Sequence, residues 1–466
     1  MRVALVALLG LFLALAPLAG SQLPAPDPFA AADTAIRAEM ERAGIPGAAV
    51  AVVVGDTVVW TRGFGVANAE TSAPVTPVTL FQIGSVTKSF TAAAILTAAS
   101  QGAIALDKPV STYVSGLTTC LGAPTLAQLL SHTGGLIDEP DEFGPQGEEG
   151  LGAYQRTWTN EYCLLPPGRA FSYSNSGFSL AGLALQEVDK QPFADVMRAR
   201  VLAPLGMTRT TFRPMEAMTW PLAVGHRKNK EGKFEVVRPL ANDARLWPAG
   251  TLYSSANEMA RFVTALMNDG KVDGKQVLPA GVATTMRAPA ASIPTTGERY
   301  GQGTFLQTEG AGHGGTMTGY VAQYSVEPDN HLAIVVLTNG DNANPQPILA
   351  AARGAAATVA LMKFGTLRGR GESVDHVVPT PMTPGQADGY AGRYSNPRRF
   401  TVEVTRTGTA LTLKRFGRDF AMDYVAPGRF TVALPRGGTE TVAFGLGADG
   451  RADYLQMNVW ALARVP

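Results

Sequence analysis

Residues 81–90 read Phe-Gln-Ile-Gly-Ser-Val-Thr-Lys-Ser-Phe, and they place a serine and a lysine at the start of an alanine-rich helix. Residues 86–100 are mostly good helix formers, and Gly102 ends the run. Three positions along a helix make about one turn, so the Lys88 ammonium comes within reach of the Ser85 hydroxyl. An amine whose pKa is lowered by burial can activate a serine, and a helix N-terminus offers N–H donors to a developing oxyanion. The stretch therefore predicts a nucleophilic serine, although a capping serine beside a solvated lysine gives the same pattern.

The length and composition describe an ordinary globular chain with more than one domain. The chain has 466 residues, of which 45% are hydrophobic and 17% charged, so we expect two or three domains with substantial cores. Residues 1–21 combine a basic start, an apolar run and small residues, which predicts a secretory signal peptide and a secreted or periplasmic protein. Removing this leader takes away one of the 39 basic residues and none of the 38 acidic ones. The balance gives no reason to expect nucleic acid or an anionic membrane as a partner, nor stable membrane insertion after cleavage.

Two cysteines, Cys120 and Cys163, remain in a chain that we expect to reach an oxidising compartment. A bridge between them would close a loop of roughly 40 residues and stabilise the fold by about 4 kcal/mol in the chain-entropy model. A disulfide is therefore the favoured interpretation, with two buried free thiols as the alternative.

Strand patterns lie at both ends of the region 28–364, and helical patterns lie between them. Residues 47–68 and 319–340 each hold two apolar, β-branched runs separated by a turn signal, as in a β-hairpin. Helical spacing marks residues 28–43, 255–270 and 348–364. The near-continuous apolar strands predict a sheet covered on one face by helices. We expect an α+β domain with an antiparallel sheet built from both ends and a helical middle.

The last hundred residues change character. Residues 365–385 replace periodic apolar positions with Gly, Arg, Pro and Thr, which predicts a linker. Residues 386–466 carry short alternating segments between turn signals, the pattern of a small all-β barrel or sandwich. We expect no concentration of chemistry there. An acidic stretch earlier in the chain, from Asp138 to Glu149, favours a solvated lid.

Three elements follow one another in the order Ser85-Val86-Thr87-Lys88, Tyr173-Ser174-Asn175 and His313-Gly314-Gly315. Together they resemble the active-site motifs of the serine β-lactamase and penicillin-binding protein superfamily, over roughly residues 30 to 360. The tyrosine of the second motif resembles the class C type, which includes D,D-peptidases, D-aminopeptidases and esterases. The resemblance implies a serine hydrolase that forms an acyl-enzyme with small-molecule or peptide substrates, namely esters, amides or peptides of D-amino acids.

Carried over by position, the resemblance implies a role for each motif residue. Ser85 is the nucleophile, Lys88 activates it electrostatically, and Tyr173 moves its proton, with a phenol pKa that Lys88 is expected to lower. Asn175 is implied to hold Lys88 or the substrate amide. The other residues implied to contact the substrate are His313, Gly314 and Gly315. The backbone N–H groups of Ser85 and Thr316 are implied to form the oxyanion hole.

The third motif differs from the Lys-Thr-Gly of many β-lactamases. Its His313-Gly314-Gly315 resembles the His-x-Gly form of the D,D-peptidases, D-aminopeptidases and esterases, and an imidazole is partly uncharged near neutral pH. We therefore expect substrates without a carboxylate to be favoured over penicillins and cephalosporins. A class C-like β-lactamase is the alternative, and a penicillin-binding sensor or scaffold that acylates without turnover is a second one.

Other chemistries find less support in the residues. The five histidines lack metal-binding spacing, so neither a metal nor another cofactor is expected. No G-x-S-x-G elbow of an α/β-hydrolase is present, and His132 is expected to be a structural turn residue. The segment from Tyr390 onward resembles the lipocalin-like barrels appended to some of these hydrolases. It could shape the cleft, mediate dimers or do neither.

Overall fold

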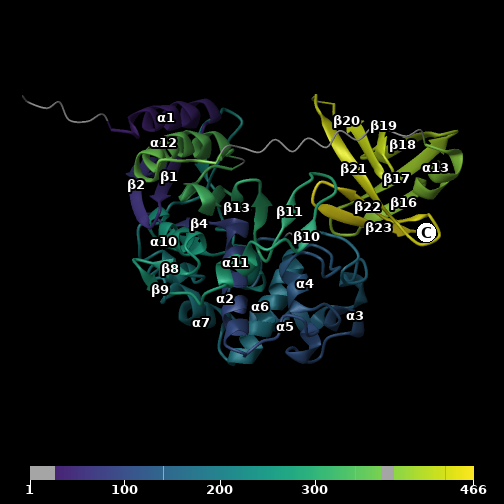
Figure 1. Cartoon of the computed structure of the whole chain (residues 1–466), viewed down its shortest axis with the longest axis horizontal. Helices are drawn as coiled ribbons and strands as arrows, with labels where there is room; N and C mark the ends of the chain where they lie inside the picture. The colour runs from purple at the N-terminus through teal and green to yellow at the C-terminus, as the bar shows by residue number, and fades with distance from the viewer. Residues whose placement is uncertain (1–26, 140, 342, 369–381, 436) are drawn as a thin grey trace, which may run out of the picture.

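A computed structural model describes residues 27–368 and 382–466 apart from residues 140, 342 and 436, and Figure 1 shows its two parts. Residues 27–368 form an α+β body, called here the sheet region, and residues 382–466 form the barrel. The expected leader and most of the expected linker, residues 369–381, lie outside the described residues.

A nine-stranded antiparallel sheet lies at the centre of the sheet region, in the order β10-β11-β12-β13-β14-β15-β1-β2-β3. Its strands are β1 (Gly47–Val54), β2 (Thr57–Asn68), β3 (Ala73–Pro74), β10 (Ala291–Ser292), β11 (Arg299–Tyr300), β12 (Phe305–Gln307), β13 (Gly310–Met317), β14 (Tyr320–Glu327) and β15 (Leu332–Thr338). The two expected hairpins meet where β1 pairs with β15, with Val52 opposite Ile334. The prediction of a sheet built from both ends of the region is confirmed.

Helices cover both faces of this sheet. Alternate residues of β1 enter two different cores, so that Ala51 packs in the core of α2 (Thr87–Ser100) and α10 (Ala256–Met267). Val52 packs on the other side, with α1 (Ala30–Ala43) and α12 (Gln346–Phe364), which lie together above the sheet in Figure 1. The expectation of helices on one face was wrong, because a strand without polar alternation is buried on both faces.

Among the described residues, α12 is one helix that is long and apolar enough to cross a bilayer. Its Ile348, Ala352 and Ala356 side chains are buried in the core beside β1 and β15. In this fold, α12 buries one face in the core, while Leu361 and Met362 near its end are exposed.

The helical middle surrounds α2, whose residues from Thr87 to Ala98 are all buried. α2 packs against α6 (Asn175–Asp189) and α9 (Trp247–Gly250), so it has no solvent-facing side over that length. The remaining short helices are α3 (Thr119–Gly122), α4 (Leu126–Leu130), α5 (Gly150–Ala153), α7 (Phe193–Met197), α8 (Pro214–Ala217) and α11 (Val282–Met286). Short two-stranded pairs complete the region: β4 (Phe81–Gln82) with β7 (Tyr253–Ser254), β5 (His226–Lys228) with β6 (Phe234–Val236), and β8 (Lys271–Val272) with β9 (Lys275–Gln276). Cys120 and Cys163 are joined in a disulfide.

The barrel is a closed ring of eight antiparallel strands, in which β23 pairs back to β16. Its strands are β16 (Gly392–Asn396), β17 (Phe400–Thr407), β18 (Ala410–Arg415), β19 (Arg418–Ala426), β20 (Arg429–Ala433), β21 (Thr439–Leu446), β22 (Ala452–Met457) and β23 (Trp460–Val465). Side chains fill the interior, among them Tyr394, Phe430 and Val442. The helix α13 (Pro384–Tyr390) precedes the ring and begins inside the segment expected to be linker. The C-terminal region is thus a barrel and not a sandwich, the two alternatives that the sequence left open.

The barrel lies against the sheet region beside β10 and β11 (Figure 1). The Tyr173 N–H donates to the Val459 carbonyl oxygen at 2.8 Å, and the Ala461 N–H donates to Ser172 Oγ at 3.1 Å. The Arg169 guanidinium holds the Asp453 carboxylate through bonds of 2.7 and 2.8 Å. The turn between β22 and β23 therefore lies directly on the second sequence motif.

Candidate active site

Ser85 lies in the 3₁₀ helix η1 (Gly84–Val86), which leads without a break into α2. Because α2 is buried on all sides, the Lys88 side chain has no exposed surface. Its Nζ lies 3.0 Å from Ser85 Oγ, 2.6 Å from Asn175 Oδ1 and 2.7 Å from the Ala249 carbonyl oxygen. The predicted approach of lysine to serine is present, and every contact of the amine is with a neutral group.

Burial lowers the pKa of Lys88 to about 7, with the Asp138 carboxylate opposing the shift and the Arg399 guanidinium adding to it. A substantial fraction of the amine is therefore uncharged near neutral pH. An uncharged amine has a free lone pair and can accept a proton.

Tyr173 does not have the acidic phenol that the sequence suggested. Burial raises its pKa above the ordinary value, and a hydrogen bond with Ser85 only partly opposes the shift. The Lys88 Nζ lies 4.8 Å from the centre of the Tyr173 ring, but its own charge is depleted. The expected lowering was wrong because the cost of burying a phenolate exceeds the attraction of a half-neutral amine. Tyr173 is therefore a protonated hydrogen-bond donor beside Ser85.

The edge of β13 passes so close to η1 that glycine is required on both sides. A Cβ atom on Gly315 would lie 2.0 Å from the Ile83 carbonyl oxygen, and one on Gly84 would lie 2.5 Å from the Thr316 nitrogen. Gly84 also has a φ of +52°, in the left-handed region that favours glycine. This contact brings the backbone nitrogens of Ser85 and Thr316, the predicted oxyanion donors, to the same edge of the pocket.

His313 is buried, with 3% of its surface exposed. Its Nδ1 lies 2.6 Å from the Gly314 carbonyl oxygen, which can only accept, so Nδ1 carries the proton and Nε2 accepts from the Tyr300 hydroxyl at 3.0 Å. Burial, with Lys88 as a second cause, lowers the pKa of His313 to about 3. The expectation of a ring that titrates near its ordinary pKa was wrong, and the imidazole is neutral around pH 7.

His132 is a turn residue that supports the second motif. It has a φ of +58°, its Nδ1 accepts the Ser174 N–H at 3.0 Å, and its ring lies 4.2 Å from that of Tyr173. Burial lowers its pKa well below the ordinary value. It therefore packs behind Tyr173 as a neutral ring.

Two acidic residues of the expected solvated lid are buried, with exposed fractions of 0% for Asp138 and 2% for Glu139. Asp138 Oδ1 accepts the Asn175 N–H at 2.8 Å, while Oδ2 accepts from Trp460 Nε1 at 3.3 Å and forms an ion pair with Arg399. The lid interpretation was wrong for both residues, because the barrel covers them.

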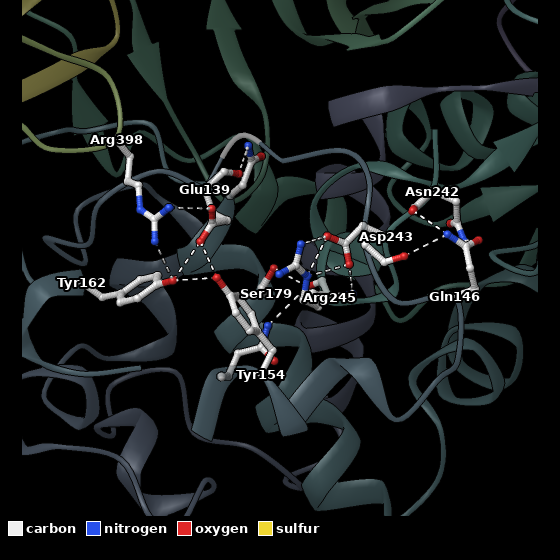
Figure 2. A network of polar contacts seen from close by, with 12 residues as sticks. Glu139, Gln146, Tyr154, Tyr162, Ser179, Asn242, Asp243, Arg245 and Arg398 are labelled. Carbon is white, nitrogen blue, oxygen red and sulfur yellow. Dashed lines mark hydrogen bonds and ion pairs between the residues drawn. The ribbon is translucent and has the colours of Figure 1, made fainter. Parts of the chain in front are cut away.

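Glu139 meets the neighbouring arginine of the barrel. Its carboxylate accepts from the Tyr162 hydroxyl at 2.9 Å and the Tyr154 hydroxyl at 3.0 Å, and it lies 3.7 Å from the Arg398 guanidinium (Figure 2). The doublet Asp138-Glu139 thus faces the doublet Arg398-Arg399. The charge match between these doublets is a signal in the sequence that could have linked the two segments.

A pocket of about 600 Å³ opens over Ser85. Its lining includes the residues of the second and third motifs, among them Tyr173, Asn175, His313, Gly314, Gly315 and Thr316. The barrel contributes Arg399, Val459 and Trp460. Of the roles left open for the barrel in the sequence analysis, the structure favours shaping the cleft.

Comparisons with known proteins agree with this arrangement. A family model described as Beta-lactamase matches residues 32–359, well over half of the chain. Penicillin-binding protein 4 of Amycolatopsis lactamdurans is 28% identical over 322 residues, which are 64% of this chain and 81% of that protein.

Solved structures extend the likeness into the barrel. The crystal structure of SurE has a TM-score of 0.73 and 26% identity, and covers 93% of this chain and 98% of SurE; a second structure of SurE, with D-Leu, has a TM-score of 0.71. The octameric penicillin-binding protein homologue from Pyrococcus abyssi shares the fold with a TM-score of 0.61 at 23% identity, over 93% of this chain and 99% of its own. From the motifs, the fold and these matches, the chain belongs to the beta-lactamase family, within the superfamily of serine β-lactamases and penicillin-binding proteins.

Proposed function

We propose that this protein is a serine hydrolase that forms an acyl-enzyme at Ser85 and cleaves amide or ester bonds. The observation that carries the proposal is the buried Lys88 amine, 3.0 Å from Ser85 Oγ and with a pKa of about 7. An amine in this state is matched to proton transfer at neutral pH.

The contacts of Lys88 favour a role as the base. Asn175 Oδ1 and the Ala249 carbonyl oxygen can only accept, whereas the Ser85 hydroxyl can donate as well. An uncharged amine gives its two N–H groups to these two oxygens, and its lone pair then faces Ser85 Oγ–H.

The reaction follows from this arrangement. Ser85 Oγ attacks the carbonyl carbon of the substrate as its proton moves to Lys88 Nζ, and the N–H groups of Ser85 and Thr316 receive the developing oxyanion. The bond to the leaving nitrogen or oxygen then breaks, and the proton passes to that atom. The protonated phenol of Tyr173, which is hydrogen-bonded to Ser85, is the donor nearest to this transfer. Water then cleaves the acyl-enzyme by the same steps in reverse.

For the substrate we propose carboxylic esters, or amides and peptides of D-amino acids, rather than penicillins and cephalosporins. The neutral His313 supports this choice, because it offers a β-lactam carboxylate no charge. The likeness to SurE, a structure of which contains D-Leu, supports the D-amino-acid class. The leader-like start of the sequence and the Cys120–Cys163 disulfide support export to an oxidising compartment.

The proposal is tested by labelling with a fluorophosphonate probe and by turnover of p-nitrophenyl butyrate, D-amino-acid amides, D-Ala-D-Ala peptides and nitrocefin. The probe should label Ser85 in the wild-type protein and nothing in Ser85→Ala. Ser100→Ala, at the exposed end of the same helix, is the matched control and should label fully. Labelling of another serine in Ser85→Ala contradicts the proposal, and acylation without turnover of any substrate favours the sensor instead.

A further inference from the structure

One ion pair joins the barrel to the catalytic motifs. Arg399 lies in the turn between β16 and β17, its guanidinium lies 4.5 Å from the centre of the Trp460 ring, and it pairs with Asp138 Oδ2. Asp138 has no exposed side-chain surface, and 23% of the Arg399 side chain is exposed. A carboxylate that is buried this completely needs a cationic partner, and in the described residues the barrel supplies it.

The pair continues directly into the active site. The other oxygen of Asp138 accepts the N–H of Asn175 at 2.8 Å, at the first residue of α6. Asn175 Oδ1 in turn accepts from Lys88 Nζ at 2.6 Å. Arg399 therefore reaches the catalytic amine through two intervening residues, Asp138 and Asn175.

We infer that Arg399 is a positioning residue of the active site, which holds Asp138 and thereby Asn175 against Lys88 and balances the Asp138 charge beside the amine. The inference rests on the proposed function, in which Lys88 is the base for Ser85. It adds that the barrel controls the position and charge of Lys88.

The groups that face Lys88 divide into charged and uncharged ones. Tyr173 is protonated, and burial keeps the rings of His132 and His313 neutral. Asp138 and Arg399 are the charged groups that act on the pKa of Lys88, the carboxylate raising it and the guanidinium lowering it. Removing Arg399 leaves the carboxylate alone, so Lys88 holds its proton to a higher pH.

The test is the rate at which a fluorophosphonate phosphonylates Ser85, with loss of fluoride, measured from pH 5.5 to 9.5. Arg399→Met should move the midpoint of this profile upward by about one pH unit, which lowers the rate at pH 7 roughly fivefold. Asp138→Asn should move the midpoint downward, because it removes the opposite charge while its amide oxygen still accepts the Asn175 N–H. The double variant Asp138→Asn/Arg399→Met should return close to the wild-type midpoint, which a purely structural loss would not do.

Arg169→Met is the matched control, because it breaks a different ion pair between the barrel and the sheet region, that with Asp453. Its midpoint should equal that of the wild type. Arg399→Lys, which keeps the charge, should shift the midpoint less than Arg399→Met. If Arg399→Met fails to fold, Arg399→Lys, Asp138→Asn and the double variant, which buries no unpaired charge, give the same comparison.

Several results would overturn the inference. One is a shift in the same direction for Asp138→Asn and Arg399→Met, and another is a double variant displaced as far as Arg399→Met. A third is an Arg399→Met protein that keeps the wild-type midpoint but has a raised KM for p-nitrophenyl butyrate. Arg399 would then act on the substrate itself. A wild-type Ser85 that is not labelled at any pH contradicts the proposed function instead.

Discussion

The start of α2 and the first turn of the barrel each bring a basic side chain to the site around Ser85, and the two side chains differ in charge. Lys88 contacts the neutral oxygens of Ser85, Asn175 and Ala249, and burial lowers its pKa to about 7. Arg399 contacts a carboxylate, and a guanidinium stays protonated in proteins. The type of basic group and the extent of its burial therefore decide whether it becomes a proton acceptor or remains a fixed charge.

The largest expected effect comes from exchanging the two kinds of cation. Lys88→Arg keeps a positive charge but cannot release its proton, so kcat/KM for p-nitrophenyl butyrate should fall by about 10²–10⁴-fold. Arg399→Lys should lower it by no more than a few fold. Circular dichroism and thermal unfolding check that both proteins fold. A Lys88→Arg enzyme as active as the wild type would mean that Lys88 acts through its charge alone.

A second effect concerns the close contact between β13 and η1. Gly315→Ala would place its Cβ 2.0 Å from the Ile83 carbonyl oxygen and push β13 away from the segment before η1. A Cβ on Gly314, in contrast, meets nothing within 4 Å. Loss of oxyanion contacts should lower kcat of Gly315→Ala by about 10²–10³-fold. Gly314→Ala is its control and should stay close to wild type. Equal losses in both variants would show that the oxyanion is held elsewhere.

The third effect is the dependence of kcat/KM on pH. Lys88 must be unprotonated to act as a base, so activity should fall about tenfold per pH unit below its pKa of about 7. Because the pKa of Tyr173 is raised, a protonated phenol persists and no alkaline loss is expected up to pH 9. A fall in kcat/KM between pH 7 and 9 would instead support the acidic phenol that the sequence suggested for Tyr173.

The smallest effect belongs to His313, the basic residue of the pocket that carries no charge. Since its pKa is about 3, the ratio of kcat/KM for nitrocefin to that for p-nitrophenyl butyrate should not change through protonation of this ring between pH 5.5 and 8.5. His313→Lys should move the ratio toward nitrocefin by roughly fivefold, the value of about 1 kcal/mol of charge-assisted bonding. Tyr300→Phe removes the hydroxyl partner without adding charge and should leave the ratio unchanged. A wild-type protein that prefers nitrocefin throughout this range would favour the β-lactamase alternative.

Local signals in the sequence were sufficient for much of the fold. The helix after Ser85, the two hairpins and the order of the three motifs depend on spacing within a few residues, and the structure has them in the expected places. The pairing of β1 with β15 followed from two apolar hairpins that each needed partners. Burial on both faces of β1 was missed, although its run of valines and alanines lacks the polar alternation of a strand with one solvated face.

The charges of the site could not be predicted in the same way. Asp138 and Arg399 are separated by 261 residues, and each occurs in a run that looks solvated. The pKa values of Tyr173 and His313 depend on desolvation, which a motif does not encode. The residues were identifiable by type and order, but their protonation states depend on how completely the fold buries them.

The turn between β22 and β23 determines when the pocket can be completed during synthesis of the chain. Ser85 and Lys88 are translated early, whereas Val459 and Trp460, which line the same pocket, leave the ribosome only after most of the chain has been made. A nascent chain that stops before β16 carries all three motifs but leaves Asp138 without its cationic partner. Because chains emerge from the amino terminus onward, we expect the pocket to be completed as one of the last steps of maturation, when the barrel closes and docks.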